Sequence, residues 1–199
     1  MPDHKNSPPR AWQRMLSGRR LDLLEPSPLD IEVEDIAHGL ARVARWNGQT
    51  RGAHAFSVAQ HSVLVERLVA ELAPRLTREA RLIALLHDSP EYVVGDLISP
   101  FKAAVGINYK ALEERLQMAV HLRFGLPAQV PASLKTLLKR ADHLSAYYEA
   151  TQLAGFQEME ARRLFGPPSK ALKTPRLTPL STAEAQAQFL ARFHRLYTQ

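Results

Sequence analysis

The chain of 199 residues contains no cysteine. This absence excludes disulfide cross-links, cysteine-based zinc ribbons and catalysis by a thiol nucleophile. The chain also lacks an apolar run long enough to cross a membrane, and its polar N-terminus, MPDHKNSPPR, has no apolar segment of the kind found in signal peptides. We therefore expect a soluble, cytoplasmic protein with no membrane association.

Blocks of like charge are missing as well. Lys and Arg total 26 against 20 Asp and Glu, which gives a formal net charge of +6. A basic protein attracts anions, but these basic residues are scattered along the chain. Scattered charge favours a mixed surface over a nucleic-acid patch, so nucleic-acid binding is kept only as an alternative.

No stretch alternates between apolar and polar residues as a half-buried strand does, whereas helical spacing recurs throughout. Hydrophobic residues make up 45% of the chain, which is enough for a sizeable core. The pattern predicts an all-α fold, a compact multi-helix bundle. The expected helices cover residues 11–16, 34–48, 57–73, 109–124, 132–155 and 181–196, and a further one begins at 77.

Proline divides the chain into three parts. Residues 1–33 hold several prolines and should form an irregular N-terminal extension. Residues 34–165 carry the helical pattern and should form the main domain. Residues 166–199 begin with the four-proline segment GPPSKALKTPRLTP, a predicted linker, and end in a helix that starts with a capping box at Ser181 and Glu184.

The most informative segment is HDSPEYVVGDLISPFK, residues 87–102. It follows the apolar stretch LIALL, which should be buried, and a buried charge is costly unless it is paired or metal-bound. Because Ser89 precedes Pro90, the helix should break and restart with Ser89 as N-cap and Pro90 in the first position. Glu91 would then lie in a new first turn, close to the His-Asp pair.

Two further ionisable residues occupy apolar helical faces. His61 lies within VAQHSVLV, and Asp142 follows Leu134 and Leu138 at helical spacing. Taken singly, such residues are more often structural than ligands. Together, two imidazoles and two carboxylates share a single explanation, one divalent cation held by His61, His87, Asp88 and Asp142.

The order His, then His-Asp, then Asp on successive helices resembles the HD superfamily of metal-dependent phosphohydrolases. The motifs ARW, AQHS, HDSPEYVVGDLISPFK and RADHLSAY carry the resemblance, which covers about residues 34–155. The sequence is most similar to bacterial HD-domain 5′-deoxynucleotidases and related phage-type nucleotide phosphohydrolases. The stretch WNGQTRGAHAFSVAQ departs from the nucleotidases and looks more like the phage-type relatives.

The resemblance implies a role for each matching residue. The four metal ligands would hold one divalent transition metal, Mn, Fe, Co, Ni or Zn. Glu91 matches an acid beside the attacking water, and Asp96 an acid facing sugar and phosphate. Arg45 matches a phosphate-binding residue and Trp46 one that faces the nucleoside, although Trp46 is equally a candidate core-filling aromatic. Two weaker matches near the phosphate are Ser99 and Lys102.

The resulting hypothesis is hydrolysis of a (deoxy)nucleoside 5′-monophosphate to nucleoside and phosphate. One alternative is a deoxynucleoside triphosphate triphosphohydrolase that uses the same metal. Another is a non-catalytic, nucleotide-binding regulatory module, which the complete set of motif residues disfavours. A nucleotide is thus the expected small-molecule partner, and a homodimer is a further hypothesis.

Overall fold

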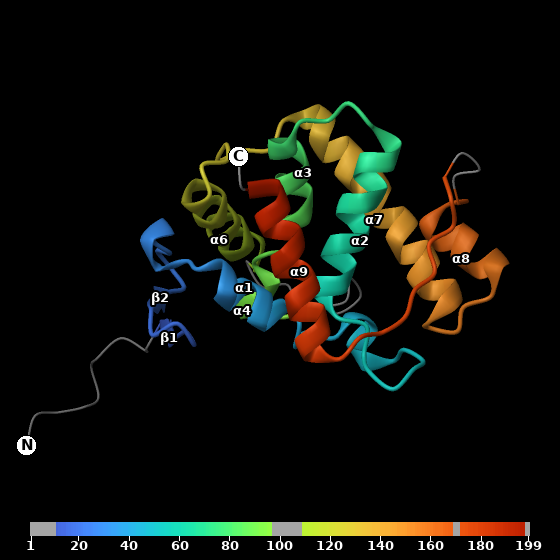
Figure 1. Ribbon diagram of the computed structural model, residues 1–199, viewed down its shortest axis with the longest axis horizontal. Coiled ribbons are helices and arrows are strands. Elements are labelled where there is room, and N and C mark those ends of the chain that lie inside the picture. Colours follow the sequence, from blue (N-terminus) through green and yellow to red (C-terminus); the bar gives the residue numbers. More distant parts are fainter. Residues whose placement is uncertain (1–10, 97–108, 169–171, 198–199) are drawn as a thin grey trace, which may run out of the picture.

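The structure, a computed structural model, describes residues 11–96, 109–168 and 172–197. Its regular structure is mostly helical, with one small hairpin among the described residues, as expected for an all-α bundle (Figure 1). Helix α2, Val58–Leu72, is central because it packs against α3, Arg78–Leu85, against α7, Ala132–Gln152, and against α9, Thr182–Tyr197. The side chains of α2 are buried along most of its length, which fits a helix enclosed by neighbours.

The N-terminal segment contains a small hairpin where a short helix was expected. Strands β1, Trp12–Arg14, and β2, Arg20–Asp22, pair antiparallel, so the predicted helix at 11–16 is wrong. Isolated hairpins are only marginally stable, and this one depends on tertiary contacts. Leu21 is fully buried, and the Ser17 backbone N–H and hydroxyl both donate to the Asp35 carboxylate. A 3₁₀ turn, η1, Pro28–Asp30, leads into the first helix.

Helix α1, Val33–Leu40, is shorter than the predicted helix over 34–48. After it the chain turns into the 3₁₀ segment η2, Arg45–Gly48. Tertiary pairing explains the early end: Ala44 forms a β-bridge with Ser57, and the Arg45 N–H donates to the carbonyl of Phe56 at 2.8 Å. These bonds use backbone groups that a continuing helix would need.

The remaining elements follow the predicted pattern more closely. The helix at 57–73 is confirmed by α2, which Ser57 caps, and the stretch LIALL is buried throughout, at 3% exposure or less. Helix α4 covers Glu91–Val94, and α6 covers Tyr109–Arg123. Helix α8, Glu158–Phe165, was not expected from the sequence. At the start of α9 the Ser181 N–H donates to Glu184 and the Glu184 N–H donates to Ser181, so the predicted capping box is confirmed.

The C-terminal segment is integrated into the same core. Two glutamine side chains hold the chain before α9: Gln60 bonds to backbone groups of Thr178 and Leu180, and Gln152 to those of Pro175 and Leu177. Helix α9 then buries two phenylalanines, Phe189 and Phe193. This packing encloses α2, which carries the first of the candidate metal ligands.

Candidate metal centre

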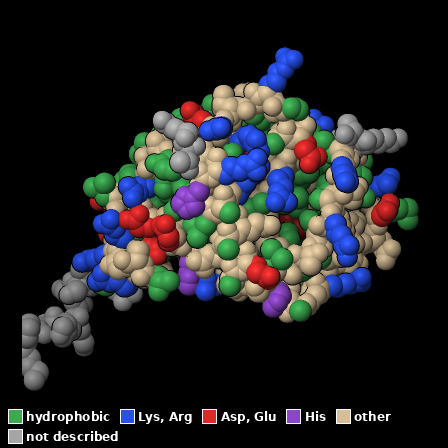
Figure 2. Space-filling model, viewed as in Figure 1, with side chains coloured by type: hydrophobic (Ala, Val, Ile, Leu, Met, Phe, Trp, Pro, Cys, Tyr) green, Lys and Arg blue, Asp and Glu red, His purple; other side chains and the backbone are tan. Residues whose placement is uncertain are grey.

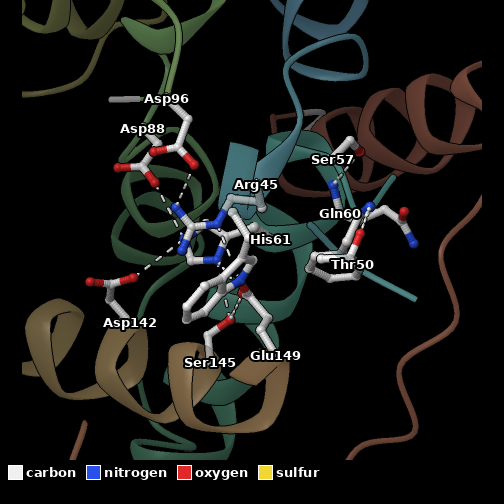
Figure 3. Close-up of polar contacts among 12 residues, drawn as sticks. Arg45, Thr50, Ser57, Gln60, His61, Asp88, Asp96, Asp142, Ser145 and Glu149 are labelled. Atoms are coloured by element: carbon white, nitrogen blue, oxygen red, sulfur yellow. Dashed lines mark hydrogen bonds and ion pairs between the residues drawn. The ribbon is translucent and has the colours of Figure 1, made fainter. Parts of the chain in front are cut away.

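His61 is the most deeply buried of the predicted site residues. It lies in the first turns of α2 and has no exposed surface. Its Nδ1 donates to Oε1 of Glu149 on α7 at 2.7 Å, because a carboxylate oxygen can only accept. In the neutral imidazole the lone pair is therefore on Nε2, which lies 3.3 Å from the carboxylates of both Asp88 and Asp142 (Figure 3).

His87 and Asp88 lie where α3 ends. The Nδ1 of His87 donates to the carbonyl of Ala84 at 2.9 Å, so its lone pair is also on Nε2, 3.1 Å from Asp88. The predicted break follows immediately, with one difference. Pro90 is the N-cap of α4, and the Ser89 hydroxyl donates to the carbonyl of Leu86 instead of capping α4, so the predicted Ser89 cap is wrong.

The side chains at this point fit a metal ion. One ligand atom each from His61, His87 and Asp88 lie within 4.8 Å of one another. Both Nε2 atoms are buried and have no hydrogen-bond partner within the described part of the chain, as expected of imidazoles oriented toward a cation. The carboxylate of Asp142, 42% exposed, lies 3.3 Å from Nε2 of His61 but is not one of these three residues, so its role as a fourth ligand stays a prediction. Mixed nitrogen and oxygen donors suit Mn, Fe, Co, Ni or Zn better than Mg or Ca.

The electrostatics of the cluster also favour a cation there. Burial raises the pKa of Asp88, but His87 and His61 outweigh it and hold that pKa well below its usual range. Burial and Arg45 lower the pKa of His61, yet Glu149, Asp142 and Asp88 together raise it well above its usual value. The carboxylates thus stabilise positive charge at the point that the two Nε2 atoms face, which is what a divalent ion supplies.

Glu91 and Asp96 flank this cluster from α4 and the turn after it. Glu91 is 7% exposed and its Oε2 is buried without a partner among the described residues. Burial, Asp88 and Asp96 raise the pKa of Glu91 to about 9. Asp96 accepts a hydrogen bond from Nη1 of Arg45 at 3.2 Å. A carboxyl group of raised pKa next to a candidate metal site is typical of an acid-base residue.

Arg45 and Trp46 approach the cluster from η2. Arg45 donates through Nε to Glu149 and through Nη1 to Asp96. Trp46 donates through its indole N–H to Glu149, and its ring packs against Phe156 and Phe165. Trp46 is therefore partly a packing residue, with its indole anchored to the same carboxylate as Arg45.

The backbone of η2 is unusual at two positions. Trp46 has φ 57° and Asn47 φ 50°, both in the left-handed region that residues other than glycine seldom adopt. Such conformations cost on the order of 1 kcal/mol each and persist where surrounding contacts hold them. The bond from Trp46 to Glu149 is one such contact.

Glu149 and Ser145 belong to the site, although the sequence analysis did not identify them. Both are fully buried on α7, and the Ser145 hydroxyl donates to Glu149 at 2.7 Å. Their spacing from Asp142, three and seven residues, places all three on one face of a helix. Applying that spacing to Asp142 would have revealed them. The other two predicted residues, Ser99 and Lys102, lie outside the described residues.

Two cavities bear on the site. A small one of about 270 Å³ is lined by site residues together with side chains of α6: His87, Asp88, Pro90, Glu91, Glu113, Glu114 and Gln117. A larger cavity of about 740 Å³ lies between α7 and α8, on the α7 face opposite to Asp142 and Glu149, and contains none of the predicted residues. We assign the chemistry to the smaller cavity because it contains the candidate ligands.

The surface carries its positive charge in scattered form. Lys and Arg side chains are spread among other types over the face in Figure 2. No helix among the described residues is long and apolar enough to span a membrane.

Comparison with known proteins places this cluster in a family. Residues 58–147 match the HD domain model, a span that includes His61, His87, Asp88 and Asp142. An uncharacterized protein of Rhodobacter capsulatus is 60% identical over 190 residues, which cover 94% of this chain and 96% of that protein. The uncharacterized protein YfdR of Escherichia coli is 30% identical over 167 residues, covering 84% of this chain and 85% of YfdR. The chain therefore belongs to the HD-domain family of metal-dependent phosphohydrolases.

Proposed function

We propose that this protein hydrolyses a deoxynucleoside 5′-monophosphate to nucleoside and orthophosphate, using one divalent transition metal held by His61, His87, Asp88 and Asp142. The observation that carries the proposal is the orientation of the two imidazoles. Acceptors fix both Nδ1 protons, so both Nε2 atoms face the Asp88 carboxylate, and a metal bound there would take their lone pairs. This arrangement is expected of a metal centre and has little use in a purely structural cluster.

A bound divalent ion acidifies a water molecule and neutralises charge that develops on the phosphoryl oxygens. Glu91 is placed to orient that water, because its Oε2 is buried beside Asp88 and has no partner among the described residues. The positive charge of a bound metal would favour the ionised form of Glu91, which could then accept the proton of the water. Arg45 is placed to bind phosphate. Its Nε and Nη1 are held by Glu149 and Asp96, which fixes the guanidinium beside the candidate metal ligands.

The distribution of positive charge supports a monophosphate over a triphosphate. A triphosphate carries about two more negative charges than a monophosphate and requires more cations nearby. Two arginines close in sequence to Arg45 are engaged elsewhere. Arg42 donates to the carbonyl of His38 and to Gln186, and Arg51 lines the cavity on the opposite face of α7. Of these three arginines, Arg45 is the one that contacts the site, through Asp96 and Glu149.

The test is to incubate protein reconstituted with Mn²⁺, Co²⁺ or Zn²⁺ with matched deoxynucleoside mono-, di- and triphosphates and to identify the products. We expect orthophosphate and nucleoside from monophosphates. The variant Asp88→Asn should lose activity, while His143→Gln, an exposed substitution on the same helix as Asp142, should retain it. Tripolyphosphate released from a triphosphate, with no action on monophosphates, would favour the triphosphohydrolase. Nucleotide binding without turnover would favour the regulatory module.

A further inference from the structure

Glu149 joins two parts of the site through its two carboxylate oxygens. Oε1 accepts from Nδ1 of the ligand His61 and from the hydroxyl of Ser145, each at 2.7 Å. Oε2 accepts from the indole N–H of Trp46 at 2.8 Å and from Nε of Arg45 at 3.2 Å. One oxygen therefore bonds to the candidate ligand His61, and the other bonds to Arg45 and Trp46.

We propose that Glu149 is a positioning residue that couples the two sides: it orients His61 for the metal and, through the same carboxylate, holds Arg45 and Trp46 for the substrate. The inference has two halves. The substrate half, that Glu149 holds Arg45 and Trp46, rests on the proposed function. The metal half, that Glu149 orients His61, rests on the geometry of His61. It predicts that one substitution at a residue in contact with neither metal nor substrate will weaken both kinds of binding.

The metal half follows from the chemistry of imidazole. A carboxylate at Nδ1 fixes the tautomer, fixes the ring orientation and makes Nε2 a better donor. Glu149 has no exposed surface, so water cannot take over as acceptor if the carboxylate is removed. Loss of such a partner typically weakens metal binding by about 10- to 100-fold.

The substrate half follows from the conformation of η2. Trp46 and Asn47 adopt left-handed backbone angles that need outside contacts to persist. The bonds from Glu149 to Trp46 and Arg45 connect this segment directly to α7. Without these bonds, Arg45 keeps its bond to Asp96 but loses the second contact that orients its planar guanidinium group.

Glu149→Gln is the sharpest substitution because it preserves size. An amide has one oxygen and one NH₂ group, so whichever way it turns, NH₂ meets the donors on one side. A matched control is Glu66→Gln, because Glu66 is an equally buried carboxylate, on α2, whose partners Arg81 and Arg192 belong to α3 and α9. Both variants should lose folding stability; only the Glu149 variant should lose metal affinity.

The primary measurement is the affinity of chelator-stripped protein for Zn²⁺ and Mn²⁺, by competition with a chelating dye. We expect Glu149→Gln to bind at least about tenfold more weakly than wild type, and Glu66→Gln to bind as wild type. The second measurement is Trp46 fluorescence in a Trp12→Phe background, which should change in Glu149→Gln and stay unchanged in Glu66→Gln. Equal metal affinity in wild type and Glu149→Gln would overturn the inference, as would equal losses in both variants.

Ser145→Ala is a milder variant in case Glu149→Gln does not fold. It removes one donor to Oε1 and leaves the carboxylate in place, so we expect a smaller loss of metal affinity in the same direction. An unchanged affinity in this variant, with Glu149→Gln unfolded, counts against the inference. The proposed function fails separately: wild-type protein that binds metal but releases no phosphate from any nucleotide refutes the activity and leaves the metal half of the inference standing.

Discussion

Replacing Glu91 with glutamine should stabilise the metal-free protein while abolishing its turnover. The physical reason is the environment of the side chain. Glu91 is 7% exposed, and burial together with Asp88 and Asp96 raises its pKa to about 9 from an ordinary value of 4.5. Glutamine resembles the neutral acid in shape and carries no charge. The substitution therefore removes the free-energy cost of an ionisable group in a buried site, and it also removes the proton acceptor that turnover needs.

The sign follows from proton linkage. Between pH 4.5 and pH 9 the unfolded chain releases the Glu91 proton while the folded protein keeps it, so wild type loses stability as pH rises through that range. Within this range, each rise of one pH unit lowers the free energy of unfolding of wild type by about 1.4 kcal/mol. At pH 7, which is 2.5 units above 4.5, the accumulated loss is between about 3 and 4 kcal/mol, and we expect the free energy of unfolding of Glu91→Gln to exceed that of wild type by about 3 kcal/mol.

The assay is urea unfolding in the presence of a chelator at pH 5, 7 and 8.5, with the same substitution at the exposed Glu25 as control. The difference between Glu91→Gln and wild type should grow with pH, while Glu25→Gln should follow wild type throughout. Turnover of the metal-loaded variant should be lost with metal still bound. Parallel stability curves for wild type and Glu91→Gln would refute the argument that Glu91 is neutral in the metal-free fold.

Three further substitutions test other parts of the site. Asp142→Asn should reduce metal occupancy, measured by elemental analysis, by at least about tenfold because an amide is a poorer ligand than a carboxylate; undiminished occupancy would remove Asp142 from the ligand set. Gly39→Ala should destabilise the fold by about 1 to 3 kcal/mol and lower kcat, because a Cβ at this position would lie 2.7 Å from Cβ of Tyr92 and force α4 to shift. A melting temperature and a kcat equal to those of wild type would contradict this reasoning. Arg45→Lys should raise KM strongly with little change in fold, because lysine keeps the charge without the fork; an unchanged KM would mean that Arg45 serves Glu149 and Asp96 alone.

The sequence by itself determined the fold class and most of the bundle. Helical periodicity is a local property, so it located α2, α6, α7 and α9 closely, and the capping box at Ser181 and Glu184 located the start of α9. It also singled out His61, His87 and Asp88, because an ionisable residue within an apolar stretch is costly and therefore conspicuous. The structure brings their ligand atoms within 4.8 Å of one another.

Contacts between distant segments decided what the sequence did not show. The hairpin at Trp12–Asp22 exists because Leu21 enters the core and Ser17 bonds to Asp35, and no local pattern contains that information. The end of α1 was set by the bridge between Ala44 and Ser57.

Glu149 illustrates the same limit within the site. In the sequence it is one acidic residue among several on a long helix, and acidic residues on helices usually face solvent. Only the packing of α2 and η2 against α7 gives it four donors, from His61, Ser145, Trp46 and Arg45. A buried carboxylate becomes stable only when such partners converge from separate elements, and that convergence is a property of the tertiary structure.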